Sequence, residues 1–450
     1  MRDTIFTDIE GEAAEFLSNL ISINTTNPPG NETAAAKFVA ETLKHEGFEC
    51  DLFESAPGRG SVVTRLRGSG GKPSLLLLSH LDVVAANPKE WSVDPFGGLV
   101  RDGFVWGRGA LDMKGMTAVE VMALKLLKRN GVKLEGDVVL AATADEEKGG
   151  EAGAGWLVRN HPDIVRADYV LNEGGGIAMN MDGKSVFTIN TAEKGILWLR
   201  ITAAGTPGHG SVPGAADNAI MRMNRVVEKL GTYRPAIRLV PTARQCISEM
   251  AKFEPLKDLS SLLQDTAKSD KILDIFARRD RYLAEELRSS VRMTVAPTMI
   301  SGGVKENIIP SECDAVFDCR VLPGQTTAEA LRDIKDLLKR EGIDRLSFEV
   351  IQANEPSESP LKTPLYHTIV KVLQDLEPGA SAIPVLLTGG TDSRFFRKLG
   401  SVCYGFHPVL PETSYSKMLE TVHGIDERIS TRNLAFGTSV LYKVIERFMT

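Results

Sequence analysis

The 450-residue sequence has few cysteines, no long hydrophobic run and no excess of positive charge. Its five cysteines are odd in number, widely spaced and without a Cys-x-x-Cys pair, which predicts buried thiols in a reducing cytoplasm. No apolar stretch approaches the roughly 20 residues of a membrane-spanning helix, and residues 1–8 lack the apolar core of a signal peptide. The net charge of −6 and the pI of about 5.8 argue against nucleic acid or an anionic membrane as a partner.

The order of apolar segments predicts a large α/β protein. Hydrophobic content of 42% and charged content of 25% are near globular averages, and the length predicts two or three domains. Strands alternate with helices in the first part of the chain and again after Pro360, which implies a mostly parallel or mixed sheet flanked by helices. Strands are predicted near 61–67, 75–80, 137–143, 168–172 and 383–387, and helices near 8–22, 33–46, 114–130, 151–160, 364–376 and 431–448.

From about Glu193 the pattern changes to strands in which apolar and polar residues alternate, as half-buried antiparallel strands do. Their β-α-β-β-α-β order is that of a ferredoxin-like domain. A polar helical stretch, about 254–290, interrupts this order, and its charge run at 278–281 favours a solvated helix face over a binding patch. The predicted strands lie near 197–202, 293–300, 312–320 and 345–352, and the helices near 217–231 and 326–341.

His80 and Asp82 follow a run of four leucines, 75–78, that predicts a strand buried on both faces. In an extended segment residues i and i+2 point the same way, so Asp82 can lie behind His80 and fix its tautomer. This is the usual support of a metal-bound histidine. The carboxyl ends of parallel strands are also where open α/β sheets keep their sites.

Four further segments carry the same kind of chemistry, although an acid at a strand end is more often a helix cap or a solvated loop residue. Asp112 lies in the glycine-rich turn 107–115, just before a helical pattern. Two apolar strands end in acids, at Glu146-Glu147 and at Glu173, and His423 lies in a polar loop far downstream. Their number, with two of only seven histidines, argues against coincidence.

Imidazole and carboxylate donors without thiolate suit zinc, cobalt or manganese in a hydrolytic role. Five donors exceed the three that one catalytic zinc takes, and they suit two ions about 3.5–4 Å apart with a bridging carboxylate. Glu146 and Glu147 are neighbours at a strand end and point in different directions. One can therefore bind metal while the other acts as general base.

The chain resembles the di-zinc amidohydrolase and metallopeptidase family that contains acetylornithine deacetylase, succinyl-diaminopimelate desuccinylase, aminoacylase and a glutamate-releasing carboxypeptidase. The resemblance runs nearly end to end, and its motifs are specific only together. It implies a zinc-peptidase catalytic domain with a central mixed sheet, formed by 1–192 and 356–450, and an inserted ferredoxin-like lid and dimerisation domain, 193–355. Besides the segments above, it rests on residues 25–32, 205–211, 307–310, 318–320 and 389–392.

The resemblance also implies a role for each candidate. His80 and Glu173 would hold one zinc, Glu147 and His423 the other, and Asp112 would bridge them. Glu146 would be the general base, and Asp82 would orient His80. A cis peptide often follows the bridging aspartate in the family, which here is Asp112–Met113.

Residues of the inserted domain are expected to bind substrate. By the resemblance, His209 would bind the scissile carbonyl oxygen as an oxyanion donor, in its own subunit or across a homodimer interface. Arg320 offers a fixed fork for a carboxylate, Asn307 a hydrogen bond, and the turn Gly389-Gly390-Thr391 an anion site at a helix entry. A structural ion pair, a turn residue and a helix cap are equally good explanations of these last three.

These observations predict metal-dependent hydrolysis of an amide bond next to a free carboxylate, in N-acyl or peptidyl amino acids. Two divalent ions per chain, zinc with cobalt or manganese as alternatives, would polarise the carbonyl and lower the pKa of a water molecule whose proton Glu146 accepts. Glu173 favours a deacylase or carboxypeptidase, because family dipeptidases tend to have Asp at that position. A dipeptidase on the same scaffold and a non-catalytic binding protein are the alternatives. A homodimer paired through the lid domain is expected.

Overall fold

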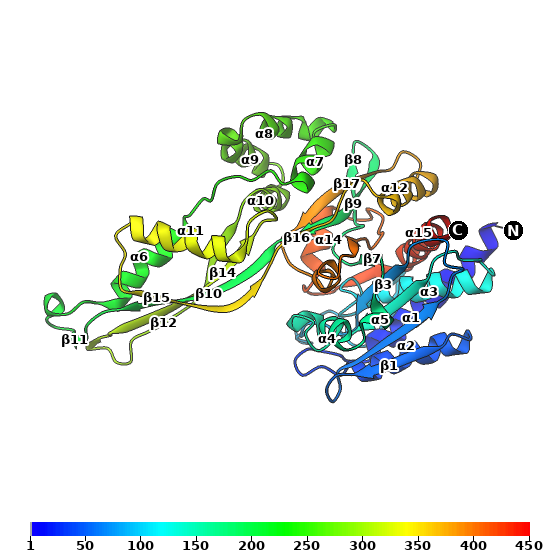
Figure 1. Ribbon diagram of the computed structural model, residues 1–450, viewed down its shortest axis with the longest axis horizontal. Coiled ribbons are helices and arrows are strands. Elements are labelled where there is room, and N and C mark those ends of the chain that lie inside the picture. The colour runs from blue at the N-terminus through cyan, green and yellow to red at the C-terminus, as the bar shows by residue number, and fades with distance from the viewer. Residues whose placement is uncertain (1) are drawn as a thin grey trace. The chain divides into compact units, whose positions relative to one another are not determined.

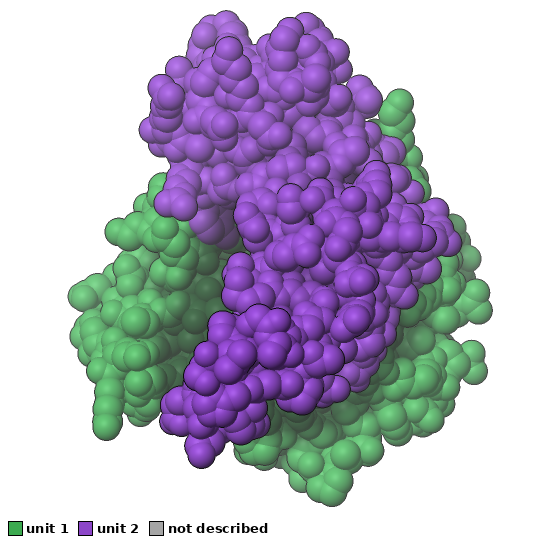
Figure 2. Space-filling model, turned by 90° about the vertical axis from the view of Figure 1, so that its left-hand side faces the viewer, with its two compact units in different colours: residues 1–191, 359–385, 391–450 green, residues 192–358, 386–390 purple. Residues whose placement is uncertain are grey.

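The computed structural model describes residues 2–450 and divides the chain into two compact units. Unit 1 comprises residues 1–191, 359–385 and 391–450, and unit 2 comprises residues 192–358 and 386–390. Figure 1 traces the chain, and Figure 2 distinguishes unit 1 in green from unit 2 in purple. Among the described residues, no helix combines the length and apolar character needed to cross a bilayer.

Unit 1 is built on a mixed sheet with the strand order β1-β2-β6-β3-β7-β18-β9, which confirms the predicted α/β class. The central strands β6, β3, β7 and β18 run parallel, whereas β1, β2 and β9 pair antiparallel with their neighbours. Both β8 and β17 pair with β9. The bounds are β1 Cys50–Glu54, β2 Gly60–Leu66, β3 Leu75–His80, β6 Val138–Thr143, β7 Tyr169–Asn172, β8 Ala178–Met181, β9 Lys184–Glu193, β17 Ser381–Leu387 and β18 Val402–Gly405.

Helices cover both faces of this sheet, which is why its central strands are continuously apolar. Leu75 and Leu77 pack into a core shared with α1, α2, α3, α12 and α15, and Leu76 and Leu78 pack into a second core with α4, α5 and α13. The predicted two-sided burial of the leucine run is confirmed. The bounds are α1 Arg2–Ser22, α2 Glu32–His45, α3 Lys114–Arg129, α4 Ala154–Asn160, α5 Pro162–Val165, α12 Pro364–Leu376, α13 Ser393–Arg397 and α15 Thr431–Met449.

One predicted helix begins later than expected. The sequence pattern predicts a helix over 151–160, but α4 starts at Ala154 after a 3₁₀ turn, η1, at Glu146–Lys148. The reason is Asp145, whose carboxylate accepts a hydrogen bond from the Ala152 backbone N–H at 2.9 Å and holds residues 145–152 as a loop. A small sheet of β4 Leu99–Arg101, β5 Phe104–Trp106 and β19 Arg428–Ser430, and the short helix α14 Tyr415–Thr421, complete unit 1.

Unit 2 contains a four-stranded antiparallel sheet with the order β12-β14-β10-β15. The chain passes through β10, α6, β12, β14, α11 and β15, so order and connectivity follow the ferredoxin-like plan. In β10, Leu197, Leu199 and Ile201 are buried in the core beneath the helices, while the residues between them are more exposed. The bounds are β10 Gly195–Ala204, α6 Ala219–Gly231, β12 Thr294–Gly302, β14 Glu312–Val321, α11 Thr327–Arg340 and β15 Leu346–Asn354.

A helical segment separates α6 from β12, as the polar stretch predicted. Within its charge run, Asp280 is the N-cap of α10 and accepts a hydrogen bond from the Leu283 backbone N–H at 3.0 Å. The remaining elements of unit 2 are β11 Gly208–His209, η2 Pro213–Ala215, α7 Pro241–Met250, η3 Glu254–Leu259, α8 Ser260–Gln264, η4 Thr266–Lys268, α9 Ser269–Ala277, α10 Arg281–Ser290, β13 Ile308–Ile309 and β16 Ser357–Glu358.

Candidate active site

Three neighbouring parallel strands of unit 1 end at one edge of the sheet, and each delivers acidic or imidazole side chains there. His80 ends β3, the turn with Glu146 and Glu147 follows β6, and Glu173 follows β7. Asp112 lies two residues before the start of α3, and the expected cis peptide Asp112–Met113 is present. Open α/β sheets place their sites at this edge because the loops after parallel strands meet there.

The five candidate donors form two groups that share Asp112. In one group, His80 Nε2 lies 3.1 Å from Asp112 Oδ1 and 3.8 Å from Glu173 Oε1. In the other, His423 Nε2 lies 2.9 Å from Asp112 Oδ2 and 3.3 Å from Glu147 Oε1. One carboxylate thus presents an oxygen to each imidazole, which is the arrangement that a pair of ions with one bridging ligand requires.

The electrostatics of the groups fit divalent cations. Burial raises the pKa of Glu173 well above its usual value, and the neighbouring carboxylate of Asp112 raises it further. Glu147 Oε1 is buried and faces His423 Nε2 at 3.3 Å. Clustered carboxylates away from water are costly unless positive charge compensates them. Oxygen and imidazole donors without thiolate match zinc, cobalt or manganese.

Without metal, the two imidazoles supply positive charge beside these carboxylates. Hydrogen bonds to Asp112 and Glu147 raise the pKa of His423 to about 10. Burial alone would lower the pKa of His80, but its hydrogen bonds to Asp112 and Asp82 raise it well above its usual value. Burial likewise opposes ionisation of Asp112, yet its two imidazole partners hold its pKa far below the usual range.

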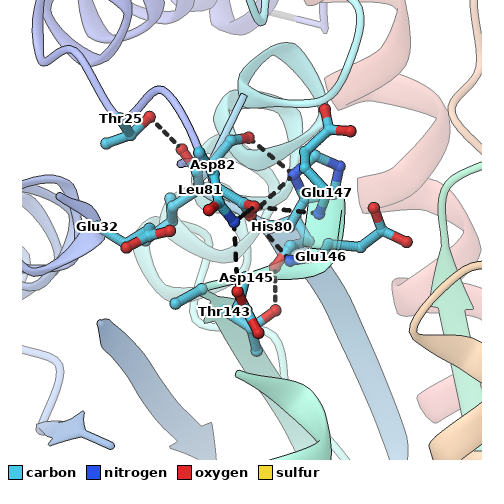
Figure 3. A network of polar contacts seen from close by, with 12 residues as sticks. Thr25, Glu32, His80, Leu81, Asp82, Thr143, Asp145, Glu146 and Glu147 are labelled. Atoms are coloured by element: carbon cyan, nitrogen blue, oxygen red, sulfur yellow. Dashed lines mark hydrogen bonds and ion pairs between the residues drawn. The ribbon is translucent and has the colours of Figure 1, made fainter. Parts of the chain in front are cut away.

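Asp82 contacts His80 Nδ1 and also holds the turn that carries Glu146 and Glu147. His80 Nδ1 donates to the backbone oxygen of Asp82 at 2.9 Å, whereas the Asp82 carboxylate is 3.5 Å away. This bond leaves Nε2 as the nitrogen that can bind metal. The carboxylate also accepts the backbone N–H groups of Glu146 and Glu147, both at 3.1 Å. In Figure 3, the carboxylates of Glu146 and Glu147 extend from this turn in different directions.

Arg108 and Glu427 also hold the site together, although the sequence analysis did not single them out. Glu427 Oε1 accepts the backbone N–H groups of Leu111 at 2.7 Å and Asp112 at 3.0 Å, and its Oε2 binds Arg108 Nη1 at 2.6 Å. Arg108 Nη2 donates to the backbone oxygen of His423 at 3.1 Å. This buried pair joins the turn that carries Asp112 to the loop that carries His423. Arg108 lies within the Gly-Arg-Gly motif, but no spacing rule links it to a residue 319 positions away.

The candidate substrate residues His209, Asn307 and Arg320 lie in unit 2. Exposed His209 is in β11, which pairs with β13 directly after exposed Asn307, and its Nδ1 is 2.7 Å from Ser211 Oγ. In β14, Arg320 Nε and Nη2 donate to the two carboxylate oxygens of Asp318 at 2.7 and 3.0 Å.

The predicted anion turn spans both units, because Gly389 and Gly390 belong to unit 2 and Thr391 belongs to unit 1. Buried Thr391 Oγ1 accepts hydrogen bonds from Asn172 Nδ2 at 3.3 Å and from the Ser393 backbone N–H at 3.2 Å. The helix that follows, α13, has only five residues. Thr391 is therefore also a structural residue of the loop that follows β17.

Known proteins resemble this chain over most of its length. The model of peptidase family M20/M25/M40 matches residues 76–447. The N-fatty-acyl-amino acid synthase/hydrolase PM20D1 of Xenopus tropicalis is 30% identical over 369 residues, which cover 79% of this chain and 68% of that protein. Aminoacylase-1 of Sus scrofa is 27% identical over 447 residues, 97% of this chain and 95% of that protein. The fold matches that of Sso-CP2, an M20 family metallo-carboxypeptidase from Sulfolobus solfataricus, with a TM-score of 0.73 at 18% identity over 97% of this chain and 99% of that one.

Proposed function

The chain belongs to peptidase family M20/M25/M40, and we propose that it hydrolyses N-acyl-amino acids at the amide bond next to the free carboxylate. The family match confirms the resemblance predicted from the motifs, and with it a metal-dependent hydrolase of amide bonds. One observation carries the proposal: two groups of metal donors share Asp112, and Glu146 lies on the same turn as the donor Glu147.

In this proposal each residue of the cluster has one task. His80 and Glu173 would hold one ion, Glu147 and His423 the other, and Asp112 both. The bound ions would polarise the scissile carbonyl and lower the pKa of a water molecule.

Glu146 is the proposed general base: it takes the proton of the attacking water and returns it to the leaving amine. Burial, and then the charge of Glu173, raises the pKa of Glu146 well above its usual value. A raised pKa suits a carboxylate that must hold a proton between the two transfers.

The proposed substrate class rests on the names of the relatives and on unit 2. One relative is named for N-fatty-acyl-amino acids and another is an aminoacylase, and both names describe an acyl group on an amino acid. We assign the carbonyl oxygen to His209 and the free carboxylate to Arg320 and Asn307, with the turn Gly389-Gly390-Thr391 as a further anion contact. Because Asp318 already accepts hydrogen bonds from Nε and Nη2 of Arg320, the substrate carboxylate would bind Nη1.

A substrate panel tests this function. The protein is loaded with zinc, cobalt or manganese and assayed with N-acetyl, N-succinyl and long-chain N-acyl amino acids, their carboxamides, and unblocked dipeptides. We expect turnover of N-acyl-amino acids, and loss of turnover on chelation. Turnover of dipeptides alone would favour the dipeptidase alternative, and no turnover with two bound ions would favour a binding protein. We propose zinc as the native metal, because imidazole and carboxylate donors are those of catalytic zinc sites.

We further propose that the enzyme is a homodimer that pairs through unit 2. The edge strand β12 is exposed along most of its length, and Met299 and Ile300 keep 68% and 62% of their surface. An exposed edge strand is a template for pairing with another chain, and a two-fold dimer is the commonest oligomer. Replacing Met299 and Ile300 with lysine should yield monomers in sedimentation, whereas a wild-type monomer would contradict the proposal.

Complementation separates the two possible positions of His209. Inactive Glu146→Gln chains mixed with inactive His209→Ala chains should recover activity if His209 serves the partner's metals. No recovery in verified heterodimers would assign His209 to its own subunit.

We also propose a cytoplasmic location, because none of the five cysteines forms a disulfide and four of them are buried thiols.

A further inference from the structure

Residues 25–27 run beside the residues that follow β3. Asn27 N–H donates to the Val83 backbone oxygen at 2.9 Å, and Val83 N–H donates to the Thr25 backbone oxygen at 3.2 Å. Thr25 Oγ1 also donates to the Leu81 backbone oxygen at 2.6 Å (Figure 3). These bonds place the side chain of Asn27, which is only 5% exposed, against Asp82.

The Asn27 amide joins two buried carboxylates. Its Nδ2 donates to Asp82 Oδ2 at 2.8 Å and to Asp145 Oδ1 at 3.3 Å. Its Oδ1 accepts from Arg59 Nη2 at 2.8 Å, and Arg59 Nη1 binds Glu32 Oε1 at 2.5 Å. The amide thus accepts from a cation and donates to two acids, and Arg59 Nη2 also lies 3.4 Å from Asp145 Oδ1.

Both carboxylates control the turn that carries the proposed base. Asp82 accepts the backbone N–H groups of Glu146 and Glu147. Asp145 precedes the turn with a left-handed φ of 72°, which non-glycine residues adopt only when their surroundings hold them there. Its Oδ2 binds the Ala152 N–H at the other end of the loop. Fixing the two carboxylates therefore fixes where the Glu146 side chain begins.

We propose that Asn27 is a positioning residue for catalysis: its amide cross-links Asp82 to Asp145 and so holds the Glu146–Glu147 turn in its working position. This inference rests on the proposed role of Glu146 as base. Only an amide can serve here, because it donates to two carboxylates and accepts from Arg59 at the same time. An aspartate would keep the shape and the bond from Arg59, but it would place a third carboxylate against two others.

The chain offers a matched control for this substitution. Asn24 lies three residues earlier and is exposed, and its Oδ1 accepts hydrogen bonds from the Thr26 backbone N–H and Oγ1 at 2.9 and 2.7 Å. A carboxylate can accept the same two bonds. Asn24→Asp therefore makes the same chemical change in the same segment and keeps both of these accepted bonds.

The test compares Asn27→Asp and Asn24→Asp at saturating metal with an N-acyl-amino acid. We expect Asn27→Asp to bind two ions and to lose about ten- to a hundredfold in kcat, the worth of hydrogen bonds to charged groups, while KM changes by less than about threefold. Asn24→Asp should match the wild type. Unchanged kcat in folded Asn27→Asp, or failure to bind two ions at saturation, would overturn the proposal.

Two further measurements separate positioning from general stability. In the metal-free protein, hydrogen–deuterium exchange of residues 144–153 should be faster in Asn27→Asp than in the wild type, with no change in the peptide covering α15. The exchange variant Asn27→Asp/Asp145→Asn restores an amide–carboxylate contact between positions 27 and 145, although not the one to Asp82, and asparagine tolerates the left-handed φ. It should recover part of the lost kcat. If the single variant and the exchange variant lose kcat equally, the proposed cross-link is contradicted.

If Asn27→Asp does not fold, Asn27→Ala gives the same test without the added charge, and an unchanged kcat there would overturn the proposal. Failure of the underlying function looks different. If Glu146→Gln keeps full activity, then the base is wrongly assigned. If Glu146→Gln is inactive while folded Asn27→Asp keeps full kcat, only the role of Asn27 is wrong.

Discussion

Loading the metal-free protein with zinc should release protons, because both candidate imidazoles hold one. His423 has a pKa of about 10 through its bonds to Asp112 and Glu147, and the pKa of His80 is raised well above its usual value. Metal binds only the neutral imidazole nitrogen. At neutral pH the ions must therefore displace a proton from each ring.

The imidazoles set the minimum slope. Displacing their two protons makes the product of the two binding constants rise about hundredfold for each pH unit, as long as the pH lies below both pKa values, and a proton displaced from Glu173, whose pKa is also raised, would add to this slope. For His423 this range extends to about 10. The effect of pH on folding has the opposite sign. Because the pKa of His423 is raised in the folded protein, its protonated ring stabilises the metal-free fold at pH values below the pKa of the unfolded chain. This stabilisation is lost as the pH rises through about 10.

Calorimetric titration with zinc in two buffers of different ionisation enthalpy counts the released protons, and chelator competition between about pH 6.5 and 8 gives the slope. His423→Asn should release one proton fewer, and asparagine accepts the left-handed φ of 58° at this position. His45→Asn replaces an exposed imidazole far from the donors and should change nothing. Zinc binding without proton release would refute the reasoning, because the rings would then be neutral beforehand.

Three further predictions concern single residues. Glu146→Gln should keep both ions while kcat falls by about 10²–10⁴; loss of an ion there, with both kept in Glu147→Gln, would reverse the two roles. Asp112→Ala should remove both ions in metal analysis, whereas one retained ion would show that Asp112 does not bridge. Arg320→Lys should lower kcat/KM for a carboxylate substrate about ten- to a hundredfold, and equal turnover of that substrate and its carboxamide would exclude a carboxylate contact.

The sheet of unit 1 was predictable because its strands are buried on both faces. The leucine run at 75–78 has no polar alternation, and only a strand covered by helices on each side tolerates that. The ends of β3, β6 and β7 then determine which acidic residues lie at the same edge of the sheet. The alternation in β10 predicted the half-buried sheet of unit 2 in the same way. Local periodicity is therefore sufficient for the buried strands β3, β6 and β7 and for the sheet of unit 2, whereas β1, β9 and β18 of the unit 1 sheet were not predicted.

The contacts that hold the donors in place were not predictable. Arg108 meets Glu427 across 319 residues, and Asn27 meets Asp145 across 118. Both contacts join loops, whose paths depend on the finished fold and leave no period in the sequence. The spacing of Asp82 predicted its contact with His80 Nδ1, but not the two backbone N–H groups of a later turn that its carboxylate also accepts.

Burial separates the acids that can bind metal from the acids that hold the backbone. Asp82 and Glu427 are fully buried, and each accepts two consecutive backbone N–H groups, those of Glu146 and Glu147 or those of Leu111 and Asp112. The candidate ligands Asp112 and Glu173 keep 14% and 18% of their side-chain surface. Neither fully buried acid belongs to the two groups of metal donors, so both support the site through the turns they hold, and Asp82 also through its contact with His80. The sequence shows one cluster of acids, and only the backbone contacts divide it into ligands and supports.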